Sequence, residues 1–133
     1  MKYRILIIFA FLSSCSDPDL CPELNYNSLN KITTSNETPY TGRCLLLDED
    51  GNKRSIQQYL NGVDYGKWIF YFQNGNIETK GKFNNGVRVG KWKYYHESGM
   101  IKQLSRYNRK GERVGKWIEY DDQGNEIKAT IYE

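Results

Sequence analysis

Segments of aromatic and branched apolar residues recur along this chain at a regular interval, and short polar stretches separate them. Trp68-Ile69-Phe70-Tyr71-Phe72 is one such segment, and Trp92-Lys93-Tyr94-Tyr95 is the next. Each is preceded by Gly-Lys and followed by a short polar stretch that contains glycine, such as Gln73-Asn74-Gly75-Asn76. Side chains of a β-strand alternate between two faces, and a polar turn with glycine at positive φ closes a hairpin. The pattern therefore predicts a series of β-hairpins.

Three positions of each hairpin recur along the chain with a period of 24 or 25 residues. A glycine opens the unit, a second glycine lies nine positions later and an aromatic residue seventeen positions later, as in Gly42, Gly51 and Tyr59; Gly66, Gly75 and Phe83; Gly90, Gly99 and Tyr107; and Gly115, Gly124 and Tyr132. Periods of about 20 to 50 residues are typical of stacked repeats. We predict an all-β domain over residues 39–133, an antiparallel meander of about eight strands. Four stacked hairpins, about 42–65, 66–89, 90–114 and 115–133, would form an elongated, twisted single-layer sheet.

Alternation distributes the aromatic side chains over both faces of the predicted sheet. Aromatic residues make up 14% of the chain while its mean hydropathy is −0.76, so most apolar surface is carried by rings on strands. One ladder would comprise Trp68, Trp92 and Trp117, and the other Tyr71, Tyr95 and Tyr120. Packing of both ladders is one interpretation. The other is that the ladder left exposed forms a protein-binding face, because a contiguous apolar strip marks an interaction site.

The N-terminus has the features of a bacterial lipoprotein signal. Lys2 and Arg4 precede an apolar run over residues 5–12 that is too short to span a membrane. Leu12-Ser13-Ser14-Cys15 then resembles a lipobox, which predicts a signal helix over residues 1–14, its removal and lipid attachment at Cys15. An ordinary secretory signal with an incidental Cys15 is the alternative. The expected location is the cell envelope, lipid-anchored at the outer membrane on its periplasmic or surface side.

Residues 15–38 are rich in Asn, Ser and Thr and are predicted to be mostly a polar tether. Within it, the pattern over residues 24–32 leaves open an extra edge strand or a short helical turn. The tether also holds Cys21, which can pair with Cys44 in an exported protein. Such a disulfide would join the leading segment to the first hairpin. Two reduced thiols, with Cys44 a small buried residue, are the other interpretation.

Charge excludes one class of partner and leaves a candidate patch. Without Lys2 and Arg4, 17 basic and 16 acidic side chains remain, and a net charge of +1 does not favour nucleic acid. The candidate basic patch combines cations beside the tryptophans with a cluster near the third turn, namely Lys67, Lys91, Lys116, Arg106, Arg109, Lys110 and Arg113. It could meet anionic lipid headgroups, lipopolysaccharide or an acidic protein. A solvated strand face is the plainer interpretation.

The recurring Gly-Lys-Trp, Tyr-Tyr and Asn-Gly, opened by Pro39-Tyr40-Thr41-Gly42, resemble the MORN-repeat variant family. That family includes the bacterial group called YwqK-type antitoxins, and the resemblance covers roughly residues 39–133. It implies a twisted sheet of stacked hairpins and a non-catalytic, protein-binding role. An exported member would fit better as an immunity-like lipoprotein that faces a toxin arriving from outside.

The sequence holds no recognisable catalytic or metal-binding motif. The single histidine, His96, occupies the repeat position filled by Phe72 and Asp121, which is a plain strand position. The stretch Asp48-Glu49-Asp50-Gly51-Asn52 lacks the further ligands and closing Glu of a calcium loop. We therefore expect no enzyme activity, cofactor, metal or small-molecule substrate. Two functions remain: a lipid-anchored module that binds another protein, and a structural envelope lipoprotein that binds lipid or glycan.

Overall fold

The computed structural model describes residues 18–133 of the chain. The predicted signal segment, residues 1–14, and the predicted lipid attachment at Cys15 lie outside the described residues. Within residues 18–133 the backbone forms strands and turns and no helix. The strands are β1 (Asn25–Asn27), β2 (Ile32–Ser35), β3 (Thr38–Pro39), β4 (Gly42–Leu47), β5 (Lys53–Leu60), β6 (Val63–Asp64), β7 (Gly66–Tyr71), β8 (Ile77–Asn84), β9 (Val87–Tyr95), β10 (Ile101–Tyr107), β11 (Gly115–Tyr120) and β12 (Glu126–Tyr132).

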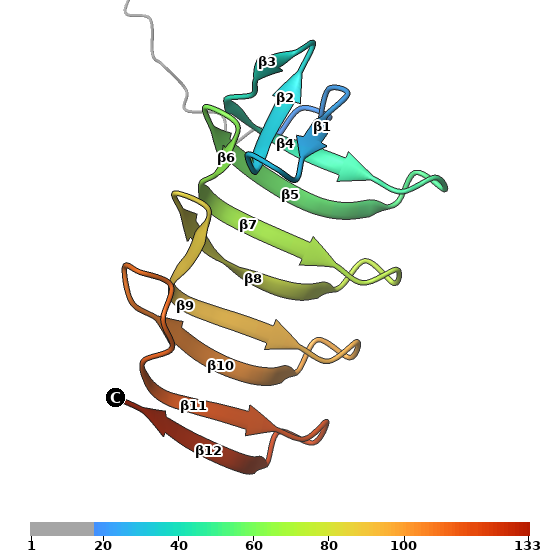
Figure 1. The fold of residues 1–133 in the computed structure, drawn as a ribbon. Helices are drawn as coiled ribbons and strands as arrows, with labels where there is room; N and C mark the ends of the chain where they lie inside the picture. Colours follow the sequence, from blue (N-terminus) through green and yellow to red (C-terminus); the bar gives the residue numbers. More distant parts are fainter. Residues whose placement is uncertain (1–17) are drawn as a thin grey trace, which may run out of the picture.

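The main sheet is an antiparallel meander that follows the order of the chain. Its strands lie in the order β12-β11-β10-β9-β8-β7-β5-β4, and the short β6 pairs with β5 off this path. Each predicted unit is one hairpin, and Figure 1 shows the four hairpins stacked with their tips on one side of the sheet. The sheet does not close into a barrel. The predicted fold, a single-layer array of stacked hairpins, is confirmed.

The polar tips close because each supplies one glycine in the left-handed region. Gly51, Gly75, Gly99 and Gly124 have φ between 83° and 89°, a conformation that only glycine adopts without strain. Neighbouring tips also touch. The side-chain amides of Asn74 and Asn76 both donate to the carbonyl oxygen of Glu97, at 3.0 and 2.7 Å. The tips of the second and third units are therefore tied together.

The core is a continuous chain of rings on one face of the sheet. Seven edge-to-face contacts, with centroids 5.1 to 6.5 Å apart, link Tyr40, Tyr59, Trp68, Phe83, Trp92, Tyr107, Trp117 and Tyr132 in that order. Trp68, Trp92 and Trp117 are 7%, 0% and 9% exposed. Of the two predicted ladders, the tryptophan ladder is therefore the one that is buried, because its rings pack between the hairpins.

Each tryptophan also makes one hydrogen bond to the hairpin before it. The indole N–H groups of Trp68, Trp92 and Trp117 donate to the carbonyl oxygens of Gln58, Lys82 and Arg106, at 2.9, 3.2 and 3.1 Å. A buried indole N–H needs such a partner. The ring of Trp92 lies directly over Gly81, where a Cβ would overlap the indole carbons. The repeated tryptophan thus joins consecutive units by packing and by a hydrogen bond.

The segment before the array is folded, in contrast to the predicted tether over residues 15–38. Strands β1, β2 and β3 form a separate three-stranded sheet, seen at the top of Figure 1. Thr33 of β2 is 4% exposed, and its N–H donates to the carbonyl oxygen of Gly62 at 2.8 Å. Gly62 N–H in turn donates to the carbonyl oxygen of Tyr40 at 2.7 Å. The small sheet is therefore fastened to the turn between β5 and β6 by backbone hydrogen bonds.

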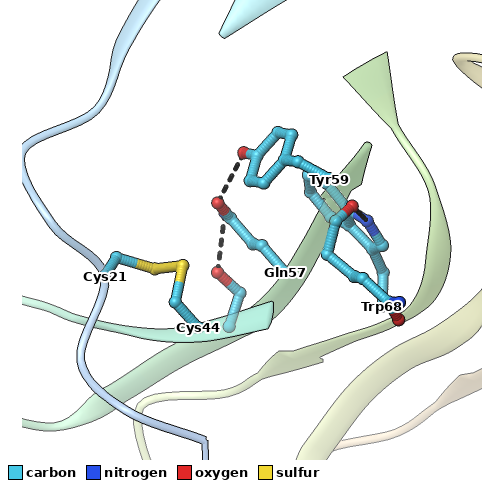
Figure 2. Close-up of a disulfide and its surroundings, with 7 residues drawn as sticks. Cys21, Cys44, Gln57, Tyr59 and Trp68 are labelled. Carbon is cyan, nitrogen blue, oxygen red and sulfur yellow. Dashed lines mark hydrogen bonds between the residues drawn. A yellow bond between two sulfur atoms is a disulfide. The ribbon is translucent and has the colours of Figure 1, made fainter. Parts of the chain in front are cut away.

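Residues 19–21 cover the outer edge of β4. The amide of Leu45 donates to the carbonyl oxygen of Asp19, and the amide of Cys21 donates to the carbonyl oxygen of Leu45, both at 2.8 Å. In the structure Cys21 and Cys44 form a disulfide, with Cα atoms 4.7 Å apart. Figure 2 shows this bond beside Gln57 and Tyr59, whose side chains are hydrogen-bonded at 2.7 Å. We refer to residues 19–21 with this disulfide as the β4 seal.

Candidate functional site

The face opposite the ring core carries a row of cations that the strand register brings together. Lys67 is paired directly with Lys82, Lys80 with Lys93, and Lys91 with Arg106. Each pair lies on the side away from the buried tryptophans, because strand side chains alternate and Trp68 and Trp92 point to the core. We call this surface the lysine face and define it by Lys67, Lys80, Lys82, Lys91, Lys93, Arg106 and Lys116.

Like charges directly opposite each other on neighbouring strands are unfavourable. Side chains so placed have Cβ atoms about 4.5–5.5 Å apart, and like-charged pairs destabilise a sheet. Within residues 18–133 this face has one ion pair, between Lys116 Nζ and Glu126 Oε1 at 3.5 Å. Lys80 has a weaker compensation, with Nζ 5.3 Å from the ring centroid of Tyr95. The remaining cations are exposed or half-buried without an acidic partner among the described residues.

The lysine face is hollowed where β9, β10 and β11 meet. This hollow has a volume of about 410 Å³, and its lining includes the apolar side chains of Ile101, Leu104 and Ile118. Lys91, Lys93, Arg106 and Lys116 also line it. We call it the β9–β11 hollow. It combines an aliphatic floor with four cations, and one of these cations is already paired with Glu126.

A second hollow of about 530 Å³ lies further along the same face. Lys67, Lys82 and Arg109 are among its lining residues. Arg109 belongs to the turn between β10 and β11, so this turn extends toward the lysine face. The two hollows together place cations from β7 to β11 along one continuous side of the sheet.

The structure brings most residues of the predicted basic patch to one face of the sheet and places Arg113 on the other. Lys67, Lys91, Lys116 and Arg106 lie on the lysine face, and Arg109 lines the second hollow. Lys110 is exposed in the β10–β11 turn. Arg113 is on the other side, with its guanidinium carbon 4.9 Å from the ring centroid of Trp117 and its Nη1 donating to the hydroxyl of Tyr132 at 3.1 Å. Arg113 therefore covers the end of the ring core.

The tyrosine ladder keeps part of its surface. Tyr71, Tyr95 and Tyr120 are half-buried and lie on the lysine face, toward the hairpin tips. The carbonyl oxygen of Tyr120 is 3.0 Å from Nε2 of His96. His96, the single histidine of the chain, therefore links the third hairpin to the fourth.

Lys80, Lys82 and Lys93 were not predicted as part of the patch. The prediction grouped cations by their place beside Gly-Lys-Trp and by proximity in sequence. A signal was available, because Lys93 lies two residues after Lys91 on the same strand and so on the same face. Counting alternation along the return strand β8 from the hairpin tip places Lys80 and Lys82 on that face as well.

Two aspartates, Asp48 and Asp121, hold hairpin tips through hydrogen bonds within their own turns. Asp48 and Asp121 accept hydrogen bonds from Asn52 and Asn125, whose amides lie 2.8 Å from the carboxylate oxygens. For Asp48 the backbone N–H of Asn52 is the main cause that lowers the pKa, and for Asp121 it is the side chain of Asn125. Within residues 18–133 no three His, Cys, Asp or Glu side chains are grouped to hold a metal ion. Nor does this part of the chain contain a helix with the length and hydropathy to cross a membrane.

Comparison with known proteins gives one family match. Residues 64–85 and 88–109 match the family described as "MORN repeat variant". These ranges cover the second hairpin unit and most of the third. No curated protein matches the chain.

One solved structure matches with low similarity. It is described as "Crystal structure of GtfA/B complex bound to UDP and GlcNAc" and is 15% identical over 87% of this chain, with a TM-score of 0.39. This chain spans 28% of the length of that one. A likeness at this TM-score says nothing about the fold or the ligands of the present chain.

Proposed function

We propose that this chain is a lipid-anchored, non-catalytic protein of the bacterial cell envelope that binds another protein through its lysine face. The match of residues 64–85 and 88–109 to the MORN repeat variant family supports a repeat surface of this kind. The anchor is Cys15, and the lipobox Leu12-Ser13-Ser14-Cys15 supports it. The binding partner is a protein of the envelope or one that reaches it from outside. An immunity-like role, in which the partner is a toxin, is the specific form of this proposal that the family resemblance favours.

One observation carries the proposal: one face of the sheet is buried by its own side chains, and the other is left charged and open. The rings of one face are buried against each other, while the other face keeps three like-charged pairs that cost stability. Repulsion between paired cations is unfavourable in the free protein, yet it recurs in three consecutive strand pairs. Such a face is suited to a ligand of opposite charge that covers it. Large flat or grooved faces of this kind are typical of stacked-repeat proteins that bind other proteins.

The test compares three full-length lipoproteins in the envelope. One is the natural chain, and one is Lys67→Gln with Lys91→Gln and Arg106→Gln on the lysine face. The third is a control with the same loss of charge, Lys31→Gln with Lys53→Gln and Lys128→Gln, at exposed positions outside the lysine face. After chemical cross-linking and purification, we expect one protein to accompany the natural chain and the control but not the lysine-face variant. Equal recovery with all three would contradict binding through this face.

Lipid attachment is tested separately. We expect incorporation of a labelled lipid precursor into the natural chain and none into Cys15→Ala. A natural chain that binds anionic vesicles or cell-wall glycan and cross-links to no protein would instead favour the structural lipid- or glycan-binding role.

A further inference from the structure

The β9–β11 hollow has a chemistry that narrows the choice of partner. Its aliphatic floor, Ile101, Leu104 and Ile118, is half-buried, and it lies among Lys91, Lys93, Arg106 and Lys116. The volume of about 410 Å³ is in the range of sites that hold small ligands or side chains. The floor and its rim therefore present two different surfaces to one ligand, apolar at the centre and positive around it.

We infer that the β9–β11 hollow binds an acidic segment of the partner protein that inserts an aliphatic side chain between its own carboxylates. This inference rests on the proposed function and names the chemistry of the partner. Carboxylates placed at the rim would meet Lys91, Lys93 and Arg106, whose cationic groups lack an acidic partner among the described residues. The aliphatic side chain would cover Leu104 and Ile118.

Both parts of the hollow favour such a segment over a membrane surface. A lipid headgroup offers negative charge to the rim, but its acyl chains stay in the bilayer and leave the aliphatic floor uncovered. An acidic protein segment supplies both groups from one chain. Charged groups at a rim mainly set association and specificity, whereas a buried apolar anchor gives most of the affinity.

The Lys80–Lys93 pair adds a second reason for an anionic ligand at this place. Lys93 lines the hollow and lies directly opposite Lys80 of the neighbouring strand β8. A carboxylate between them would replace a repulsive cross-strand pair with two attractive contacts. The hollow is thus placed where a bound acidic segment relieves the charge repulsion of the free protein.

The experiment uses the full-length lipoprotein in nanodiscs of neutral lipid and three labelled synthetic peptides. The first peptide contains Glu and Leu, the second contains Glu and Gly, and the third contains Lys and Leu. We expect the Glu/Leu peptide to bind roughly 10 to 100 times more tightly than the Glu/Gly peptide, since burying one Leu side chain accounts for a factor of this size. The Lys/Leu peptide should not bind. Fluorescence anisotropy at low and high salt measures these affinities.

Two variants locate the site. Leu104→Thr should remove the difference between the two acidic peptides, and Lys93→Gln with Arg106→Gln should weaken both and reduce the dependence on salt. Lys31→Gln with Lys53→Gln, at exposed positions outside the lysine face, is the matched control and should bind like the natural chain. Circular dichroism of each variant establishes that it is folded.

Equal binding of the Glu/Leu and Glu/Gly peptides would overturn the inference, and so would tighter binding to anionic vesicles than to either peptide. A cross-linked envelope partner on the lysine face, together with no binding of acidic peptides, would leave the proposed function standing and reject the acidic segment. Failure of every cross-link on this face would reject the proposed function itself.

Discussion

Each tryptophan of the core acts as a joint between two hairpins. The ring of Trp92 packs edge-on against Phe83 of the preceding hairpin and Tyr107 of its own, with centroids 5.1 and 6.5 Å away. Its N–H donates to the carbonyl oxygen of Lys82. Because the sheet is a single layer, these contacts replace the second layer against which a sheet usually packs. The stability of the array is therefore concentrated in a few side chains.

We expect Trp92→Ala to lower the free energy of unfolding by about 3–5 kcal/mol, since it removes a fully buried ring from a site with a backbone hydrogen bond. Urea denaturation followed by circular dichroism measures the change. Tyr95→Ala, which truncates a half-buried ring on the other face, is the control and should cost clearly less. A loss below about 1 kcal/mol for Trp92→Ala would show that the ring chain is not the core.

Tyr59 is a residue whose burial can be tested by titration. Its pKa is raised from 10.0 to about 12, mainly because burial disfavours the phenolate and also because Asp64 adds a negative charge nearby. The folded protein then holds the phenolic proton to higher pH than the unfolded chain, so stability falls as pH rises from about 10 to about 12. Urea midpoints across this window should decline less for Tyr59→Phe than for the natural chain. Equal declines would place the pH dependence elsewhere.

At the scale of elements, the first hairpin differs from the others because it carries extra structure. Cys44 occupies the position that Trp68, Trp92 and Trp117 hold in the later units. A disulfide to Cys21 fills that place, and the small sheet β1-β2-β3 packs over the turn after β5. The first unit thus has a covalent link where the others have a ring. The β4 seal and the small sheet together form the N-terminal end of the array.

Removing the disulfide should weaken this end of the array. A cross-link between residues 23 apart is worth about 3 kcal/mol from the lost entropy of the unfolded chain. We expect Cys21→Ala with Cys44→Ala, or reduction of the natural chain, to lower the free energy of unfolding by about this amount. Hydrogen exchange adds a local readout, because the amide of Leu45, bonded to Asp19, should exchange faster. Unchanged exchange at Leu45 would mean that the hydrogen bonds hold the seal without the disulfide.

At the scale of the whole molecule, the register separates apolar from charged side chains. The ring core lies on one side of the sheet and the lysine face on the other, while several acidic residues sit in the hairpin tips. A chain with a formal net charge of only +3 therefore presents one strongly positive side. Net charge alone conceals this asymmetry.

Charge repulsion across the lysine face predicts a gain in stability when one of its members is neutralised. Lys93→Gln removes the repulsion with Lys80 and should raise the free energy of unfolding by about 0.2–1 kcal/mol at low salt. The gain should shrink as salt is added, because salt screens exposed charges. Thermal unfolding at two ionic strengths measures both effects, with Lys110→Gln as a control at an exposed turn. Destabilisation by Lys93→Gln would show that the lysine packs favourably against its neighbours.

The repeat, the hairpins and their tip glycines could be predicted from the sequence, because turn chemistry and alternation are local properties. Which of the two aromatic ladders is buried could not be predicted from the sequence. Trp68 and Tyr71 both alternate as strand residues, and the choice of packed face depends on contacts between hairpins such as Phe83 with Trp92. These contacts join residues of different units and leave no local pattern.

The strands of the segment before the array could not be predicted for a different reason. Strands β1, β2 and β3 are two to four residues long and mostly polar. Backbone hydrogen bonds that join Thr33 of β2 to Gly62 and Tyr40 attach them to the array, and such bonds leave no pattern in the sequence. Composition therefore favoured a tether. The candidate site, by contrast, could have been predicted more fully, because strand alternation places three further lysines on its face, namely Lys80, Lys82 and Lys93.

The β4 seal has a consequence for polymerisation. Copies of a hairpin stack could in principle add end to end, with the last strand of one pairing with the first strand of the next, and a heterologous contact of this kind grows into open fibres. Here the central backbone groups of β4 are already bonded to Asp19 and Cys21, and the disulfide holds that segment in place. The array therefore lacks one of the two free edges that such growth requires, and the disulfide helps to keep the folded protein from forming filaments through its own sheet.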